Sequence, residues 1–220
     1  MSSFYRTFNF PFKHAIPNSI DSYLKSKSVF KRYLKYFRRV FFIVVKNQQN
    51  LEVFKISPRH KRILWINISA PSLGDSLMDL SSRVLLQDKS IDLYTDSKNA
   101  NLYLDDDFFS NIFTSAKDVD KNKYDLVIID SYSSRSMRVK AEVAPSLNYV
   151  GMYGFFNGPE VNRTLFSFHQ MNNLLGNIKE EDEILNLAKN HISISIKDQK
   201  LVKKLIPDNY NILSSQIELD

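Results

Sequence analysis

The chain has 220 residues, of which 43% are hydrophobic and 25% charged, and its formal net charge is +6. This length and apolar content are enough for one sizeable domain or two small ones with a buried core. The sequence has no cysteine, which excludes disulfides, a cysteine-ligated zinc site and a thiol nucleophile. No uncharged apolar run approaches the ~18 to 20 residues that span a bilayer, and the first residues lack the compact apolar block typical of a signal peptide. We therefore expect a cytoplasmic protein.

The positive charge is concentrated at the N-terminus. Residues 1–62 contain 14 of the 30 lysines and arginines but only two of the 24 acidic residues, Asp21 and Glu52. The rest of the chain is net acidic. This imbalance separates a basic, aromatic N-terminal extension, residues 1–60, from the remainder.

Within this extension, Asp21–Val45 has the period of an amphipathic helix. One predicted face is apolar and carries Phe30, Tyr33, Leu34, Phe37, Val40, Phe41 and Val44. The other is basic and carries Lys27, Lys31, Arg32, Lys35, Arg38 and Arg39. Such a helix either lies in the headgroup region of an anionic membrane or packs its apolar face on the main domain, and its own pattern leaves both alternatives open. We expect no nucleic-acid partner, because the cations lie opposite an apolar stripe rather than along an open groove.

A strand, a turn and a helix follow. Glu52–Ile56 is predicted to be a short strand, and the apolar run Ile63–Ile68 a buried parallel strand. Ser76–Leu86 then shows helical spacing, with Gly74 permitting a tight turn and Asp75 at the mouth of the helix. This is the first unit of a nucleotide-type α/β domain.

Strands and helices alternate from there on. The predicted strands are 91–95, 111–114, 126–129, 149–153 and 192–196. The predicted helices or turns are 99–104, 134–143, 179–190 and 200–205. The alternation predicts an α/β fold, a Rossmann-like parallel sheet with helices on both faces. Ligands bind such sheets at the carboxyl ends of the strands. We expect Asp75, Asp130, Ser131, Tyr132 and Arg135 to share that edge.

A strand followed by Ser72-Leu73-Gly74-Asp75 and an apolar helix resembles the opening motif of the lipopolysaccharide heptosyltransferases, glycosyltransferase family nine. Residues 91–95, 124–130, 133–136 and 161–176 resemble later segments of that family. The resemblance implies the N-terminal half of a GT-B glycosyltransferase. Residues 61–178 would be its acceptor domain, and residues 179–220 a bridge toward a donor domain whose sequence pattern is missing here.

The resemblance also implies roles for individual residues. Asp75 would be the general base, and the acceptor-binding residues would be Ser72, Leu73, Gly74, Ser131, Arg135 and Arg138. From the residues alone, we interpret Asp75 as a helix cap and Asp130 as a residue that ends its strand by accepting hydrogen bonds from turn amides. The two arginines are then either solvated helix cations or ligands of an acidic acceptor. The family needs no metal, and we interpret Asp105-Asp106-Asp107 as a solvated turn, so neither a metal nor another cofactor is expected.

Two functions follow from these observations. The first is transfer of heptose from ADP-heptose to the lipopolysaccharide inner core, with inversion, at the inner face of the inner membrane, where the chain would be a peripheral protein. The second is a truncated, non-catalytic membrane-associated module, or one half of a split transferase. An adjoining reading frame that encodes the donor half would identify a split or truncated enzyme.

Overall fold

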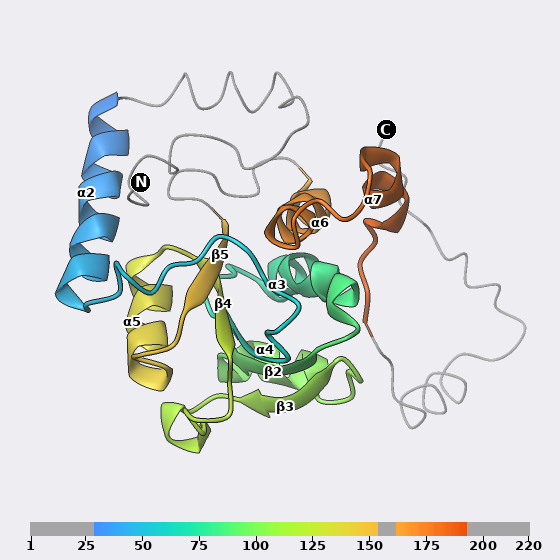
Figure 1. The fold of residues 1–220 in the computed structure, drawn as a ribbon, viewed down its shortest axis with the longest axis horizontal. Coiled ribbons are helices and arrows are strands. Elements are labelled where there is room, and N and C mark those ends of the chain that lie inside the picture. The colour runs from blue at the N-terminus through green and yellow to red at the C-terminus, as the bar shows by residue number, and fades with distance from the viewer. Residues whose placement is uncertain (1–28, 154–161, 193–220) are drawn as a thin grey trace, which may run out of the picture.

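The computed structural model describes residues 29–153 and 162–192, apart from six side chains near the start of the first helix. Its centre is a sheet of five parallel strands in the order β3-β2-β1-β4-β5 (Figure 1). The strands are β1 (Arg62–Asn67), β2 (Ser90–Thr95), β3 (Phe109–Phe113), β4 (Leu126–Ser131) and β5 (Tyr149–Tyr153). The middle strands β1 and β4 are almost entirely buried, as their continuous apolar runs predict.

Helices cover both faces of the sheet (Figure 1). Residues Ile63 and Trp65 of β1 point to one face, where they pack with α3 (Leu73–Leu80), η2 (Ser81–Leu86) and α6 (Arg163–Leu174). Leu64 and Ile66 point to the other face, toward α5 (Ser134–Val143) and α2 (Val29–Val45). The predicted α/β architecture is therefore confirmed.

Shorter elements complete the described chain. They are α4 (Ser97–Ala100), η3 (Asn101–Tyr103), η4 (Ala116–Asp118) and α7 (Glu181–Leu187). The helix α7 packs against α6 through its buried Ile184. None of the helices in the described ranges is long and apolar enough to cross a membrane.

The strand order fixes where the sheet opens. From β1 the chain proceeds to β2 and β3 on one side, then returns to place β4 and β5 on the other side. Successive connections at the carboxyl ends of β1 and β4 therefore diverge, and ligands of doubly wound sheets bind in the crevice at such a switch point.

Two predicted elements are wrong in detail. Glu52–Ile56 is not a strand: Glu52 makes one isolated bridge to Tyr149, and Ile56 N then donates to Leu174 O of α6 at 2.8 Å. The predicted helix Ser76–Leu86 begins earlier, because Ser72 caps it, and tightens to a 3-10 helix at Ser81. The Ser81 hydroxyl donates to Leu77 O at 2.7 Å, a side-chain bond that competes with regular helix geometry.

Other predicted elements agree closely. The helix 134–143 and the strand 149–153 have the predicted bounds, whereas the helix predicted at 179–190 is shortened to α7. The strand predicted at 192–196 extends beyond the described residues, and the helix predicted at 200–205 lies wholly outside them, as do residues 21–28 of the N-terminal helix.

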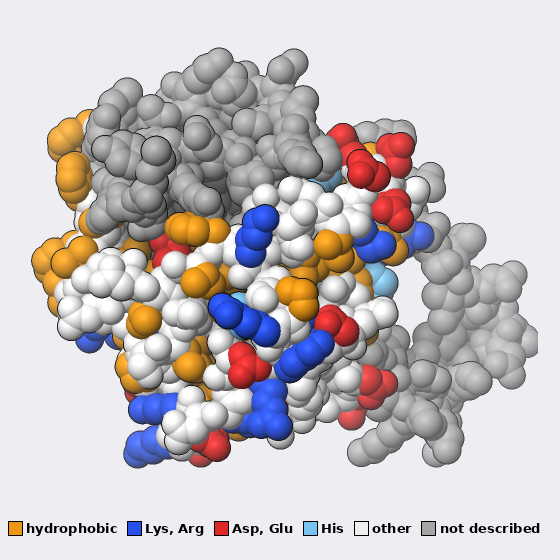
Figure 2. Space-filling model, in the orientation of Figure 1, with side chains coloured by type: hydrophobic (Ala, Val, Ile, Leu, Met, Phe, Trp, Pro, Cys, Tyr) orange, Lys and Arg blue, Asp and Glu red, His pale blue; other side chains and the backbone are white. Residues whose placement is uncertain are grey.

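The helix α2 uses two different apolar faces. Ile43 is buried and Val40 partly buried against the core beneath α5. A second stripe stays exposed and consists of Phe30, Leu34, Phe37, Phe41 and Val44. Figure 2 shows hydrophobic side chains along the edge of the molecule that α2 forms. Docking of the helix on the domain therefore leaves most of the predicted apolar face uncovered by the described residues.

A buried lysine joins the end of α2 to the domain. Lys140 of α5 is fully buried, and its ammonium donates to Gln48 Oε1 and, at 2.7 Å, to Leu147 O. The ammonium also lies 4.9 Å from the centre of the Tyr149 ring. Burial lowers the pKa of Lys140 to about 7.

This pKa predicts how stability depends on pH. The unfolded lysine has a pKa of about 10.4, so above pH 7 the unfolded chain binds more protons than the folded chain. The free energy of unfolding should therefore rise between pH 7 and 9, by at most about 1.4 kcal/mol per pH unit from this group. Urea unfolding across that range should show the rise in the native protein and a flatter dependence in Lys140→Met. Parallel curves would contradict it.

Candidate functional site

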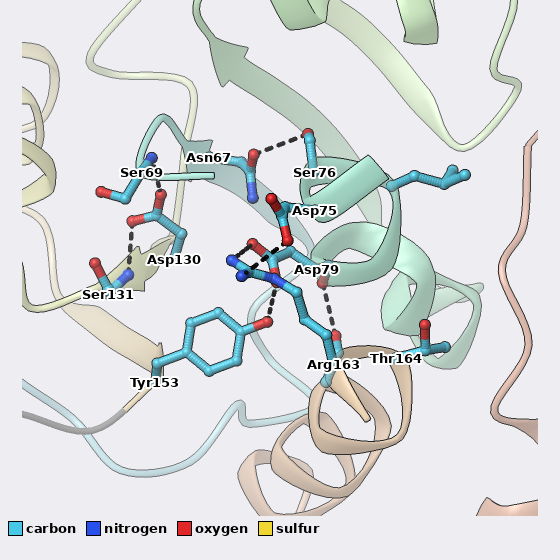
Figure 3. Close-up of polar contacts among 12 residues, drawn as sticks. Asn67, Ser69, Asp75, Ser76, Asp79, Asp130, Ser131, Tyr153, Arg163 and Thr164 are labelled. Atoms are coloured by element: carbon cyan, nitrogen blue, oxygen red, sulfur yellow. Dashed lines mark hydrogen bonds and ion pairs between the residues drawn. The ribbon is translucent and has the colours of Figure 1, made fainter. Parts of the chain in front are cut away.

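Asp75 lies in the first turn of α3, at the carboxyl edge of the sheet (Figure 3). Ser72 precedes the helix, and its hydroxyl oxygen accepts from Asp75 N at 3.2 Å while the hydroxyl donates to Asp75 Oδ2 at 2.7 Å. The other carboxylate oxygen, Oδ1, is 3.2 Å from Arg163 Nη1. The side chain of Asp75 keeps 24% of its surface exposed. The carboxylate of Asp75 is thus oriented by Ser72 and Arg163 but remains accessible to solvent or a ligand.

A second carboxylate lies one helical turn further along α3 and is buried. Asp79 accepts from Arg163 Nε at 2.5 Å and from Arg163 Nη2 at 2.7 Å. The hydroxyl of Tyr153, the last residue of β5, also donates to Asp79. Figure 3 shows Tyr153 and Arg163 converging on Asp79 from β5 and α6. Three elements are therefore joined at one carboxylate.

Burial and neighbouring charges both shift the pKa values of these three side chains, and they oppose each other at Asp79 and Arg163. Burial raises the pKa of Asp79 to about 6, and the hydrogen bonds and charge of Arg163 limit the rise. Burial alone would lower the pKa of Arg163, but the hydrogen bonds and charge of Asp79 outweigh it and raise that pKa. Burial, together with the charge of Asp79, raises the pKa of Tyr153. At neutral pH the cluster is an ion pair with a neutral tyrosine donor.

Asp130, the next-to-last residue of β4, is buried, and both of its carboxylate oxygens accept two hydrogen bonds each. Its Oδ2 accepts from Ile68 N at 2.8 Å and Ser69 N at 2.6 Å. Its Oδ1 accepts from Ser131 N at 2.6 Å and the Ser136 hydroxyl at 2.5 Å. Burial raises the pKa of Asp130, while these hydrogen bonds act to lower it. This confirms the interpretation that Asp130 lies near the end of its strand and accepts hydrogen bonds from backbone N–H groups of the turns.

The predicted acceptor-binding residues differ in exposure and in their contacts. Leu73 is 43% exposed in the first turn of α3. Ser131 is partly buried, and its hydroxyl oxygen accepts from Ser133 N at 3.3 Å. Arg138 is exposed on α5, and the exposed Arg135 lies 3.7 Å from the carboxylate of Asp96. Their roles in binding an acceptor stay predictions.

Two expectations about this edge are wrong. Gly74 is not needed for a tight turn, because it lies inside α3 without a positive φ, and an added Cβ would meet only Ser72 Oγ, at 3.9 Å. Tyr132 does not line the edge: its side chain is buried, and its hydroxyl donates to Glu52 Oε1 at 2.5 Å. Side chains alternate between the two faces of a strand end, which turns Tyr132 toward the α5 side.

Asn67 ends β1 with an unused donor. Its Oδ1 accepts from the Ser76 hydroxyl at 3.0 Å, whereas its buried Nδ2 has no hydrogen-bond partner among the described residues. In Figure 3 this nitrogen points into the space between Asp130 and Asp75. A buried amide without a partner is uncommon, so the donor marks this space as polar.

The pattern of residues predicts only part of this cluster. Asp79 lies four residues after Asp75, which places both carboxylates on one face of α3 and is a usable signal. Tyr153 ends the strand predicted at 149–153, and Arg163 lies in the segment 161–176 that resembles the transferase family, but nothing in their local pattern indicates Asp79 as their partner. The contacts join residues 74 and 84 positions apart.

The aspartate run before β3 also differs from the expectation of a solvated turn. Asp106 is buried and pairs with the buried Arg83, whose Nη2 also donates to His191 O at 2.7 Å. Asp105 and Asp107 are exposed, as expected. Within the described parts of the chain, no group of three or more acidic or histidine side chains is arranged to hold a metal ion.

The basic residues assigned to the N-terminal helix are described in part. Arg38 is exposed on α2 and Arg39 partly buried. Burial, together with the charge of Arg38, lowers the pKa of Arg39 to about 10. Lys27 lies outside the described residues, and the side chains of Lys31, Arg32 and Lys35 are likewise not described.

Comparison with known proteins gives one structural likeness. No protein-family model and no curated protein matches the chain. Among solved structures it is similar to the glycosyl transferase family 9 from Veillonella parvula DSM 2008, with 14% sequence identity and a TM-score of 0.47. The similarity covers 68% of this chain and 50% of that chain, so the alignment spans half the length of that protein.

The structure predicts that Asp130 supports the edge of the sheet. Asp130→Ala leaves the donors that it binds unsatisfied, at about 1–3 kcal/mol for each buried group. The free energy of unfolding should therefore fall by about 4 kcal/mol or more in total. Urea denaturation measures this, with Asp118→Ala in the exposed η4 as the matched control. A loss no larger than that of the control would contradict the structural role.

Proposed function

We propose that this domain is the acceptor side of a glycosyltransferase and that Asp75 is its general base. The observation that carries the proposal is the position of the Asp75 carboxylate, held by Ser72 and Arg163 and still partly exposed at the carboxyl edge of a doubly wound sheet. A carboxylate in this position is within reach of a hydroxyl group bound in the crevice.

The proposed reaction requires such a base. As an acceptor hydroxyl attacks the anomeric carbon of the donor sugar, the new C–O bond forms and the bond to the nucleotide diphosphate breaks. The hydroxyl proton passes to Asp75, and the nucleotide leaves from the opposite face, which inverts the anomeric centre. General-base catalysis of this kind contributes typically about 10²- to 10⁴-fold to the rate.

The finer assignment rests on the Ser72-Leu73-Gly74-Asp75 motif and its resemblance to heptosyltransferases. We propose an ADP-heptose-like donor, bound with the help of a second domain, and an acceptor sugar of the lipopolysaccharide inner core. Arg135 and Arg138 are exposed cations on α5, near the edge that carries Asp75. They are suited to an acceptor that carries carboxylate or phosphate groups.

The helix α2 supports a location at a membrane surface for the same domain. Its exposed stripe includes Leu34 (62% exposed) and Phe41 (61%), with the exposed cation Arg38 beside it. An apolar stripe next to cations is the composition of helices that lie in the headgroup region of anionic bilayers. We propose that α2 holds the domain on the inner face of the inner membrane, where a lipid-linked acceptor is within reach.

The base assignment predicts a specific loss of activity. Asp75→Asn keeps the shape of the side chain but cannot accept the proton. The rate of sugar transfer, measured with the proposed donor-binding domain present, should therefore fall about 10²- to 10⁴-fold. The free energy of unfolding should change by less than about 1 kcal/mol, because the pair with Arg163 is partly exposed.

The control for this variant is Asp107→Asn, which changes an exposed carboxylate on the turn before β3. Transfer from ADP-heptose to the inner core, measured by release of ADP, should be normal in the control. Normal transfer by Asp75→Asn would show that Asp75 is only a helix cap.

The membrane assignment predicts a loss of vesicle binding. Replacing Leu34 and Phe41 together by Glu removes two exposed apolar side chains and adds negative charge. Affinity for phosphatidylglycerol vesicles should fall by roughly tenfold or more. Co-sedimentation measures this, with Leu104→Glu, at a 66% exposed leucine outside α2, as the matched control. Equal binding by the double variant and the control would overturn the membrane assignment.

A further inference from the structure

The guanidinium of Arg163 is divided unequally between two carboxylates of α3. Nε and Nη2 face Asp79 at 2.5 Å and 2.7 Å, one to each carboxylate oxygen. The remaining nitrogen, Nη1, faces Asp75 at 3.2 Å. One side chain from α6 therefore connects a buried carboxylate to the partly exposed one.

Asp79 fixes the direction of this guanidinium. It is buried and accepts a further bond from Tyr153, and its backbone oxygen accepts from the Ser167 hydroxyl at 2.6 Å. A bidentate arginine–carboxylate pair constrains both the position and the plane of the guanidinium. Nη1 is therefore aimed at Asp75 by contacts that Asp75 does not itself make.

The carboxylate of Asp75 is consequently held from two sides. Arg163 holds Oδ1, and the Ser72 hydroxyl holds Oδ2 at 2.7 Å. Each oxygen retains a second lone pair, because a carboxylate accepts about four hydrogen bonds. The group is oriented by the protein and still able to accept a proton.

We infer that Arg163 is the positioning residue for Asp75, with Asp79 and Tyr153 anchoring it from behind. This inference rests on the proposed function of Asp75 as a base. Arg163 does not touch the reacting atoms; it keeps the carboxylate in the orientation in which an acceptor hydroxyl meets it. A misplacement of about 1 Å at a catalytic group costs on the order of 10²-fold in rate.

The kcat of Arg163→Met, measured with and without Asp75→Asn, separates a positioning role for Arg163 from a purely structural role in joining α6 to α3. If Arg163 acts through Asp75, then Arg163→Met lowers kcat roughly 10- to 100-fold with little change in KM. In the Asp75→Asn background it then causes no further loss. If Arg163 only joins the two helices, it lowers kcat by the same factor in both backgrounds, and the inference is overturned.

Two further variants keep this test interpretable. Arg163→Lys keeps a positive charge beside Asp79 but lacks the fork, so it should fold even if Arg163→Met does not, and should still lose kcat. Full activity of Arg163→Lys would overturn the inference. Arg59→Met, at an exposed arginine on the turn before β1, is the matched control and should be normal.

An unfolding cycle tests the contact separately from the reaction. Arg163→Met and Asp75→Asn are combined in the full chain, and the unfolding equilibrium constants are compared. A partly exposed ion pair predicts a coupling of about two- to fivefold. If the native protein shows no transfer, the proposed function fails, and this coupling still decides whether Arg163 holds Asp75. Strict additivity would overturn the inference.

Discussion

The geometry of the site depends on the hydrogen bonds that Tyr153 and Arg163 donate to the buried carboxylate of Asp79. Asp79 accepts hydrogen bonds from Tyr153 at the end of β5 and from Arg163 at the start of α6, while belonging to α3. A buried carboxylate without such partners would be costly, so its burial and the convergence of the three elements require one another. The partly exposed Asp75 takes its orientation from this arrangement.

A second buried carboxylate, that of Asp130, lies at the same edge of the sheet and has a different structural role. Asp130 joins the chain after β1 to the chain after β4 by accepting backbone N–H groups from both. These are the two strands at which the connections diverge. Asp130 therefore ties together the two chain segments at this edge, whereas Asp79 orients the guanidinium of Arg163.

Sequence reasoning was most successful where the pattern is local. The apolar runs of β1 and β4 predicted the centre of the sheet, and the periodicity of 134–143 predicted α5 at its observed bounds. It was least successful where a polar side chain meets a distant partner. The acidic neighbours of Asp106 predict a solvated side chain, whereas the arginine that pairs with the buried Asp106 lies 23 positions away. The convergence on Asp79 joins still more distant residues.

The N-terminal helix illustrates the same limit. Its periodicity predicted an apolar face, but the pattern does not tell whether that face meets the domain or another surface. The structure divides the face: Val40 turns inward with the buried Ile43, whereas Leu34 and Phe41 stay exposed. Helix periodicity finds apolar stripes, and only the tertiary fold assigns each a partner.

The proposed function places an acceptor sugar at the edge formed by α3, the end of β4 and the start of α6. An NMR titration of this chain with an inner-core oligosaccharide of lipopolysaccharide tests that placement. We expect the amide signals of Asp75, Ser131 and Arg163 to shift together and to saturate with one affinity. Saturable shifts confined to other surfaces, or no shifts at all, would rule out an acceptor site at this edge.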